Sequence, residues 1–195
     1  GVKVHSDEYM KQLRNLTAEK NVLLIVDEVQ TGNGRTGKFL AFQHAGIKPD
    51  IVTVAKGLGN GVPIGATIAF GELDFSTGLH GSTFGGNSLA CTAANFTIDY
   101  VLTNKLMQNA SNVGEYFMAK LKQLNSPLVK EVRGKGLIVG MELNCDGAEI
   151  VNKCSEKGLL VNCAAKKTLR FLPPIIASKA DVDNCINILS EVLTK

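Results

Sequence analysis

Residues 51–61 read Ile-Val-Thr-Val-Ala-Lys-Gly-Leu-Gly-Asn-Gly, a short apolar run followed by a lysine and a glycine-rich turn. The apolar run predicts a buried strand, and the glycines predict a turn directly after it. Lys56 is therefore an amine held in a fixed place, with room for a flat group beside it. A second apolar run, 22–26, ends in Asp27-Glu28-Val29-Gln30. Because this run is continuous rather than alternating, we expect a strand of a parallel sheet, covered on both faces.

Two parallel strands would bring Lys56 and Asp27 to the same edge of one sheet. An enzyme that uses pyridoxal phosphate needs these two groups, a lysine for the Schiff base and an acid that keeps the pyridine nitrogen protonated. Gln30 lies three residues beyond Asp27, where its amide can donate to the phenolic oxygen of the cofactor. Each residue alone also fits a polar strand end or a surface loop, so the prediction depends on their joint placement.

The composition argues against several classes of protein. Hydrophobic residues make up 45% and charged residues 20%, as in ordinary globular proteins. The net charge of +3 is spread along the chain without a basic stripe, which argues against nucleic acid as a partner. No apolar stretch can span a bilayer and no signal peptide opens the sequence, so we expect no membrane association and a cytoplasmic location. Five cysteines without CxxC spacing and three scattered histidines predict reduced thiols and no metal site.

A change of composition near Asn104 divides the 195 residues into two expected domains, 1–103 and 104–195. The first is expected to contain, in order, a helix over 6–20, strands over 22–26, 51–55 and 64–70, and a helix over 88–102. The second is expected to be a smaller α+β unit. Its expected elements are a long helix from 105, a strand or hairpin over 132–143, a helix over 148–157 that stops at Gly158, strands over 159–163 and 168–172, and a last helix. Ser178 and Asp181 have the spacing of a capping pair for that last helix.

The segment Gly32-Asn-Gly-Arg-Thr-Gly37 matches the GxGxxG pattern of dinucleotide-binding proteins. That fingerprint requires glycines that turn directly from a strand into a helix, and an acidic residue about 20 positions later. Residues 27–31 intervene, and the residues after Gly37 are a poor start for a long helix. A turn-forming loop is the favoured interpretation, and a nucleotide-binding module is kept as an alternative.

Two further segments contain candidate binding residues. Ser82 and Thr83 lie among glycines in the stretch 80–87, and such a loop can close around a phosphate, although plain Ser/Thr loops are common. Arg170 is the arginine of the β-like run 169–172, and arginine can hold a carboxylate with two parallel hydrogen bonds. From the residues alone, a structural ion pair or a strand residue that faces water is slightly favoured for Arg170.

Taken together, these motifs resemble the class III aminotransferases of the fold-type I pyridoxal phosphate family. The matching segments occur in the family's order over essentially the whole chain: 24–32, 34–37, 49–57, 63–65, 80–87, 132–136 and 169–174. Ser88 departs from the family, which usually has proline there. Within the class, 158–162 and 169–174 are most similar to members that act on N-acetylornithine, with members that act on ornithine or 4-aminobutyrate as close alternatives.

The resemblance implies an α/β fold, namely the C-terminal part of a fold-type I transferase. Residues 1–103 would belong to the mostly parallel sheet of the large cofactor domain, and residues 104–195 would form the small α+β C-terminal domain. The implied reaction moves the amino group of N-acetylornithine to 2-oxoglutarate, as in arginine biosynthesis. The implied assembly is a homodimer with shared active sites.

The resemblance also implies roles for single residues around the cofactor. Lys56 would carry the Schiff base and shuttle the proton between substrate and cofactor. Asp27 would pair with the pyridine nitrogen. Gln30 would bind the phenolic oxygen, with Glu28 and Val29 lining the same loop.

Other roles fall on residues farther along the chain. Thr83 would bind the cofactor phosphate of the neighbouring subunit, Ser82 would lie beside the substrate there, and Arg170 would hold the substrate α-carboxylate. The family's first half, with its main phosphate loop and its ring-stacking aromatic residue, is not in this sequence. We therefore expect the isolated chain to bind pyridoxal phosphate poorly and not to transaminate, and a non-catalytic fragment is a further alternative.

Overall fold

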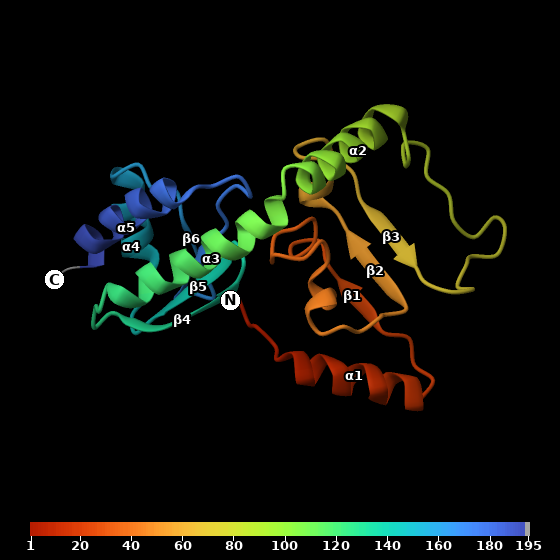
Figure 1. Cartoon of the computed structure of the whole chain (residues 1–195), viewed down its shortest axis with the longest axis horizontal. Helices are drawn as coiled ribbons and strands as arrows, with labels where there is room; N and C mark the ends of the chain where they lie inside the picture. The colour runs from red at the N-terminus through yellow and green to blue at the C-terminus, as the bar shows by residue number, and fades with distance from the viewer. Residues whose placement is uncertain (194–195) are drawn as a thin grey trace. The chain divides into compact units, whose positions relative to one another are not determined.

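The computed structural model describes residues 1–193, and these divide into two compact units. One unit is His5–Met107, and the other joins Gly1–Val4 to the described residues from Gln108 onward. Figure 1 labels the helices and strands of both units. Each unit has a sheet and helices of its own, so each is described by itself.

The sheet of His5–Met107 has the order β1-β2-β3, with β1 at Ile25–Asp27, β2 at Ile51–Val54 and β3 at Ala66–Ala69 (Figure 1). Strand β1 pairs with β2 in parallel, with Asp27 beside Thr53. Strand β3 pairs with β2 in the antiparallel direction, so this sheet is mixed. The parallel pair confirms that the two apolar runs end at the same edge of one sheet.

The first apolar run differs from its prediction in length and in burial. The strand was expected over 22–26, but β1 begins only at Ile25. Val22, Leu23 and Ile25 expose 56%, 52% and 58% of their surface, so the expectation of a strand covered on both faces is wrong for residues 1–193. The physical reason is that these three side chains belong to no hydrophobic cluster of the described unit; β1 is also the edge strand of its sheet. Its free edge carries unpaired backbone donors and acceptors that another strand can bind.

The core of this unit lies around the end of β2. Leu40, Val52, Val54, Leu58 and Ala94 form one buried cluster. Ala94 comes from α2 (Ser88–Thr103), whose first turn is capped by Asn87 as it accepts a hydrogen bond from the Ala90 amide at 3.0 Å. Leu58 ends the short 3-10 helix η2 (Lys56–Leu58), and a second 3-10 helix, η1, spans Ala41–His44. The packing of α2 therefore fixes the turn that follows β2.

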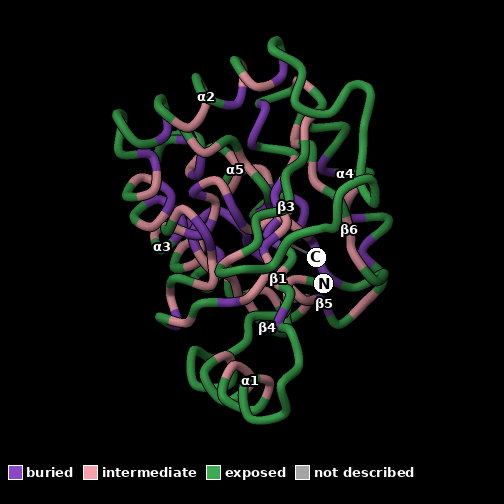
Figure 2. The backbone as a smooth tube through the Cα atoms, turned by 90° about the vertical axis from the view of Figure 1, so that its right-hand side faces the viewer, coloured by how far each residue is buried: buried purple, intermediate pink, exposed green. Residues whose placement is uncertain are grey.

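Helix α1 (Asp7–Glu19) confirms its predicted position. Ser6 caps it by accepting a hydrogen bond from the Tyr9 amide at 3.1 Å. No residue of α1 is buried, and Figure 2 shows the helix only in the colours of intermediate and exposed residues. Its apolar face, which includes Tyr9 and Leu16, is therefore open in the described chain.

The other unit has an antiparallel sheet in the order β4-β5-β7-β6, made of β4 (Val129–Lys135), β5 (Ile138–Leu143), β7 (Thr168–Phe171) and β6 (Asn162–Ala164). Three helices share its core: α3 (Leu106–Gln123), α4 (Ala148–Glu156) and α5 (Lys179–Leu193). Phe117 of α3 meets Phe171 of β7 edge to face, with ring centroids 5.2 Å apart. Gly114 lets α3 approach the β4–β5 turn, because a Cβ there would lie 2.1 Å from the Gly136 carbonyl oxygen.

The helix ends of this unit confirm the sequence signals. Ser178 and Asp181 form reciprocal bonds, with the Ser178 amide 2.8 Å from Asp181 Oδ2 and the Asp181 amide 3.3 Å from Ser178 Oγ. Gly158 follows the end of α4 with a φ of +82°, the left-handed position that glycine occupies at helix C-termini. Both ends were set by local chemistry that the sequence shows directly.

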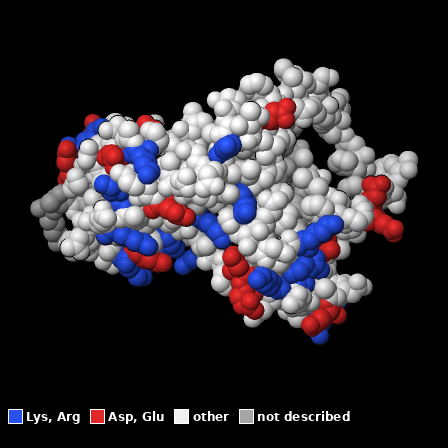
Figure 3. All heavy atoms as spheres, viewed as in Figure 1, with Lys and Arg blue, Asp and Glu red and all other residues white. Residues whose placement is uncertain are grey.

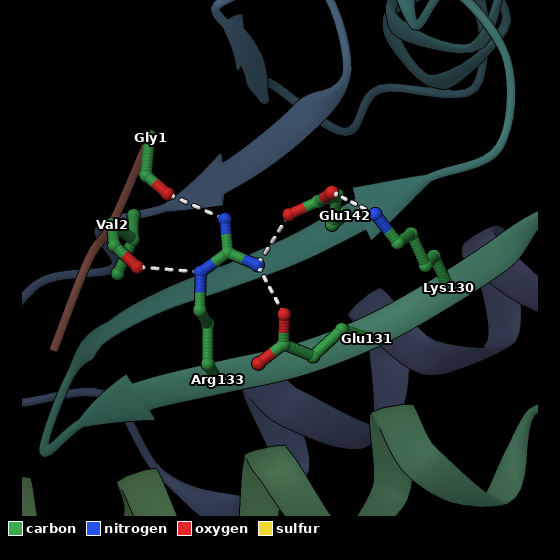
Figure 4. A network of polar contacts seen from close by, with 6 residues as sticks. All are labelled: Gly1, Val2, Lys130, Glu131, Arg133 and Glu142. Carbon is green, nitrogen blue, oxygen red and sulfur yellow. Dashed lines mark hydrogen bonds and ion pairs between the residues drawn. The ribbon is translucent and has the colours of Figure 1, made fainter.

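The first residues of the chain cross the sheet of this unit. A Cβ on Gly140 of β5 would lie 2.8 Å from the Val2 Cβ, so glycine is needed for this close approach. Arg133 of β4 holds the same segment, donating from Nε to the Val2 carbonyl at 2.7 Å and from a terminal nitrogen to the Gly1 carbonyl at 2.8 Å (Figure 4). The entry of the chain is thereby attached to the β4–β5 hairpin.

Glu142 completes this network on β5 (Figure 4). It accepts hydrogen bonds from Lys130 at 2.9 Å and from Arg133 at 2.7 Å. These two donors, Lys130 foremost, lower the pKa of Glu142 from 4.5 to about 2. The network is a structural one and involves none of the predicted site residues.

Candidate active site

Lys56 follows β2 after one intervening residue, Ala55, and begins the η2 turn. Its φ is +48°, in the left-handed region that a residue with a side chain adopts at a cost of about 1–3 kcal/mol. The side chain is exposed, and its Nζ takes part in no hydrogen bond or ion pair within residues 1–193. The turn itself requires Gly59, because a Cβ there would lie 2.2 Å from the Val62 carbonyl oxygen. The structure thus presents an unengaged amine on a constrained turn.

A left-handed lysine is not by itself a mark of a site. Lys105 and Lys166 have φ values of +53° and +63°, and neither follows a strand of the β1–β2 pair. What separates Lys56 from them is its position at the carboxyl end of β2, next to the end of β1.

Asp27 ends β1 with an exposed carboxylate. One oxygen, Oδ1, accepts hydrogen bonds from the Val29 amide at 2.9 Å and from the Thr53 hydroxyl at 3.3 Å. The other, Oδ2, accepts none from any described residue. The carboxylate is therefore oriented through one oxygen, while the second is available to a cationic donor.

Glu28 and Gln30 have different surroundings although they are near neighbours. Glu28 is fully buried, and its carboxylate accepts bonds from the Phe42 amide at 2.9 Å and from the Thr31 hydroxyl. It therefore holds the loop after β1 in shape. Gln30 and Val29 are only partly buried, and the Gln30 amide bonds no other described residue. The sheet edge thus brings together Lys56 and the 27–30 segment.

The loop 28–40 does not have the geometry of a dinucleotide fingerprint. It consists of turns and bends, such as the bond from the Gly37 amide to the Gly34 carbonyl at 3.0 Å. The next helical residues are the single turn η1, so no strand-to-helix turn is made by Gly32, Gly34 and Gly37. The alternative of a nucleotide-binding module is wrong, because the glycines do not open a helix on which a pyrophosphate would lie.

Ser82 and Thr83 lie away from this edge in the described chain. Every residue from 71 to 89 is exposed, and Figure 1 shows the connection between β3 and α2 looping out from the sheet. Ser82 Oγ accepts a bond from the Gly85 amide at 2.9 Å, within its own loop. Within residues 1–193 no hydrogen bond joins Ser82 or Thr83 to Asp27 or Lys56.

Arg170 belongs to the other unit, on β7 between Gly140 and Asn162 of the neighbouring strands. Its Nε donates to Asn162 Oδ1 at 3.3 Å. No carboxylate among the described residues pairs with it, so the alternative of a structural ion pair is not what this part of the chain shows. The remaining N–H groups of its guanidinium are free to bind an anion.

The chemistry of the sheet edge fits pyridoxal phosphate. The Lys56 amine, Asp27 Oδ2 and the Gln30 amide are each unengaged, and they match the aldehyde, the ring nitrogen and the phenolic oxygen of that cofactor. The main phosphate loop that the resemblance assigns to the family's first half is not in this sequence. The group would therefore be held only in part by this chain.

The surface and the helices add two observations. On the face shown in Figure 3, lysine and arginine side chains lie among aspartate and glutamate side chains, and neither sign forms an extended patch. No helix in the described part of the chain is long and apolar enough to cross a membrane.

Comparison with known proteins agrees with this geometry. The model of the family described as aminotransferase class-III matches residues 1–193. Two similar curated proteins are the acetylornithine aminotransferases of Aquifex aeolicus, 50% identical over 99% of this chain, and of Methanocaldococcus jannaschii, 47% identical over its full length. A similar solved structure is the ornithine delta-aminotransferase of Plasmodium falciparum, with a TM-score of 0.94 and 38% identity over 99% of this chain.

These matches also show what share of each relative's length this chain covers. It spans 50% of the length of both curated proteins and 52% of the Plasmodium chain. The family model covers all of the described residues, and the fold agrees with that of solved aminotransferases, as the sequence motifs predict. The chain belongs to the aminotransferase class-III family.

Proposed function

We propose that the complete protein that contains this chain is a pyridoxal phosphate-dependent aminotransferase, which moves the amino group of N-acetylornithine to 2-oxoglutarate in arginine biosynthesis. The observation that carries the proposal is the parallel pair β1–β2: β1 ends at Asp27, which has a free carboxylate oxygen, and β2 is followed, after Ala55, by the free amine of Lys56. An amine and a carboxylate at one sheet edge are the two protein groups on which this cofactor depends.

Three residues would each bind a different part of the cofactor. Lys56 would bind its aldehyde, Asp27 Oδ2 would bind its protonated ring nitrogen, and Gln30 would donate to its phenolic oxygen. Glu28 and Val29 would shape this loop, Glu28 through its buried bond from the Phe42 amide. When bound, the protonated ring supplies an electron sink for the substrate carbanion.

The chain's own chemistry is proton transfer and orientation. Lys56 Nζ would carry a proton between the substrate carbon that bears the amino group and the cofactor. Asp27 would keep the ring nitrogen charged, because a fixed anion within a few ångströms favours the protonated form. The substrate thereby reacts beside a base whose backbone is fixed by the η2 turn.

The choice of N-acetylornithine is supported by the names of similar proteins and by Arg170. Acetylornithine aminotransferases are among the relatives at 47–50% identity. Arg170 would hold the α-carboxylate, which suits its unpaired guanidinium. Ornithine, the substrate in the name of the Plasmodium protein, is the second candidate because that fold matches with a TM-score of 0.94.

We further propose a homodimer with shared sites. The exposed Thr83 would bind the cofactor phosphate in the neighbouring subunit, and Ser82 would lie beside the substrate there. Residues 1–103 would then belong to the large cofactor domain and 104–195 to the small C-terminal domain. A cytoplasmic location belongs to the same proposal and agrees with five free cysteines.

The isolated chain is expected to be inactive. It lacks the main phosphate loop of the family's first half, and Val22, Leu23 and Ile25 leave an apolar surface open at β1. Another part of the complete protein would cover that apolar surface and pair with the free edge of β1.

The test is an assay of the complete protein with pyridoxal phosphate and 2-oxoglutarate. Glutamate formation is measured with N-acetylornithine, ornithine and 4-aminobutyrate as donors, and kcat/KM is compared. The proposal predicts the highest kcat/KM for N-acetylornithine. A higher value for ornithine would reassign the donor, and no glutamate from any of the three would contradict the proposed reaction.

A further inference from the structure

Asn33, in the loop after β1, reaches across to the residue that precedes Lys56. Its Nδ2 donates to the Ala55 carbonyl at 3.2 Å, a bond between positions 22 residues apart. A Cβ on Gly57 would lie 3.6 Å from the Asn33 Cβ, so the side chain runs beside the turn that carries the lysine. No sequence motif singles out Asn33, because it occupies an unspecified position of the GxGxxG pattern, between Gly32 and Gly34.

The Ala55 carbonyl is the anchor of the η2 turn. It also accepts the Leu58 amide at 3.0 Å, the bond that closes the turn. Two donors thus converge on the peptide between Ala55 and Lys56, and Lys56 leaves that peptide with a φ of +48°. A carbonyl held from two sides cannot rotate without losing both bonds, so the direction in which the Lys56 side chain leaves the backbone is fixed with it.

The oxygen of the Asn33 side-chain amide indicates that this residue does more than fill space in the loop. Asn33 Oδ1 is buried and has no hydrogen-bond partner, the one such side-chain atom among residues 1–193. Exchanging the amide's oxygen and nitrogen would set two acceptors against each other at Ala55, so this orientation is the one that the contact requires. A buried unpaired acceptor lowers stability, and Asn33 therefore carries a cost that its bond to Ala55 must offset.

We infer that Asn33 is a positioning residue for Lys56: its amide fixes the Ala55–Lys56 peptide and thereby the direction of the reactive amine. The inference rests on the proposed function in so far as Lys56 is the cofactor lysine. Asn33 touches neither cofactor nor substrate in this account, and it acts only through the backbone before Lys56.

The chain offers a matched pair of variants for the test. Asn33 and Asn60 both stand between two glycines, and both have left-handed backbones, with φ values of +56° and +46°. Asn60 makes no side-chain hydrogen bond to the described residues. Asn33→Gly and Asn60→Gly therefore create the same Gly-Gly-Gly sequence without backbone strain, and only the first removes the bond to Ala55.

The first measurement uses the complete protein without cofactor. Hydrogen–deuterium exchange of the Leu58 amide should rise by about two- to tenfold in Asn33→Gly, the range for losing one net hydrogen bond. Asn60→Gly should leave that amide at the wild-type rate. Equal exchange in the two variants would overturn the inference, whatever the role of Lys56.

The second measurement follows the visible absorbance band that forms when pyridoxal phosphate is added to the cofactor-free protein. Band formation should be slower in Asn33→Gly by about two- to tenfold, because the amine is less well oriented. In steady state, kcat should fall while the KM of the amino donor stays constant. Asn33→Asp, which keeps the shape but removes the donor, should show the same changes if Asn33→Gly does not fold.

Different results would refute the proposed function and the positioning role of Asn33. If borohydride does not trap the cofactor on wild-type Lys56, the proposed function is wrong, and Leu58 exchange still decides whether Asn33 fixes the turn. If wild type is trapped on Lys56 but Asn33→Gly and Asn33→Asp both form the band at the wild-type rate, the positioning role is wrong and the proposed function stands.

Discussion

Replacing Glu28 by methionine tests whether the loop after β1 depends on one buried carboxylate. Glu28 is 0% exposed and accepts bonds from the Phe42 amide at 2.9 Å and from the Thr31 hydroxyl. Methionine has a similar volume, so the cavity left by Glu28→Met is small. The change then measures mainly the loss of the two acceptors.

The expected loss of stability depends on whether each of the two donors can find another acceptor. The Phe42 amide cannot turn away and is left unpaired, whereas the Thr31 hydroxyl can rotate toward water. A buried donor without its partner costs about 1–3 kcal/mol, and bonds to a charged acceptor lie at the upper end. We therefore expect Glu28→Met to lower the free energy of unfolding by about 2–4 kcal/mol, with the larger share from Phe42.

The assay is urea unfolding of the complete protein at one fixed protein concentration, because assembly shifts apparent stability. Glu149→Met is the matched control, since Glu149 is 79% exposed and pairs only with Lys153 one turn along α4. The control should lose less than about 1 kcal/mol. If Glu28→Met loses no more than Glu149→Met, the loop is not held by this carboxylate and the account of its shape is refuted.

Three further predictions concern the site and the small unit. Asp27→Asn should leave the circular dichroism spectrum unchanged but lower kcat by roughly 10²-fold or more, as a lost electrostatic partner does; near-normal turnover would remove Asp27 from its role. Arg170→Lys should raise the KM of the amino donor far more than the dissociation constant of pyridoxal phosphate, because lysine lacks the planar two-donor fork, and an unchanged KM would make Arg170 structural. The folded pKa of Glu142 is about 2, below its ordinary value of 4.5, so its stabilisation is complete above pH 4.5 and is lost as pH falls toward 2. Unfolding midpoints measured across this range should therefore drop more steeply for wild type than for Glu142→Gln, and parallel curves would show that Glu142 adds nothing.

Much of the fold follows from local signals in the sequence. Ser178 with Asp181, and Gly158 after α4, mark helix ends through bonds and backbone angles that depend on adjacent residues. The apolar run before Asp27 and the one before Lys56 predict two parallel strands, and their pairing confirms this. Such features are predictable because each depends on a short stretch of chain.

The rest depends on contacts that no local pattern encodes. The run 22–26 reads as a covered strand, yet its cover is not among residues 1–193, and β1 begins at Ile25. Glu28 reads as a lining residue but is wholly buried, because Phe42 lies against it from 14 positions away. Asn33 was not predicted at all, since its bond to Ala55 joins two loops without any periodicity.

The measurement that tests the central claim most directly is borohydride reduction of the complete protein with pyridoxal phosphate, followed by peptide mapping. Lys56 should carry the reduced cofactor, because its free amine follows β2 beside Asp27. Lys105→Ala, which removes another left-handed lysine, should leave the labelling unchanged, and Lys56→Ala should abolish it. Label on a different lysine, or label that persists in Lys56→Ala, would contradict the account.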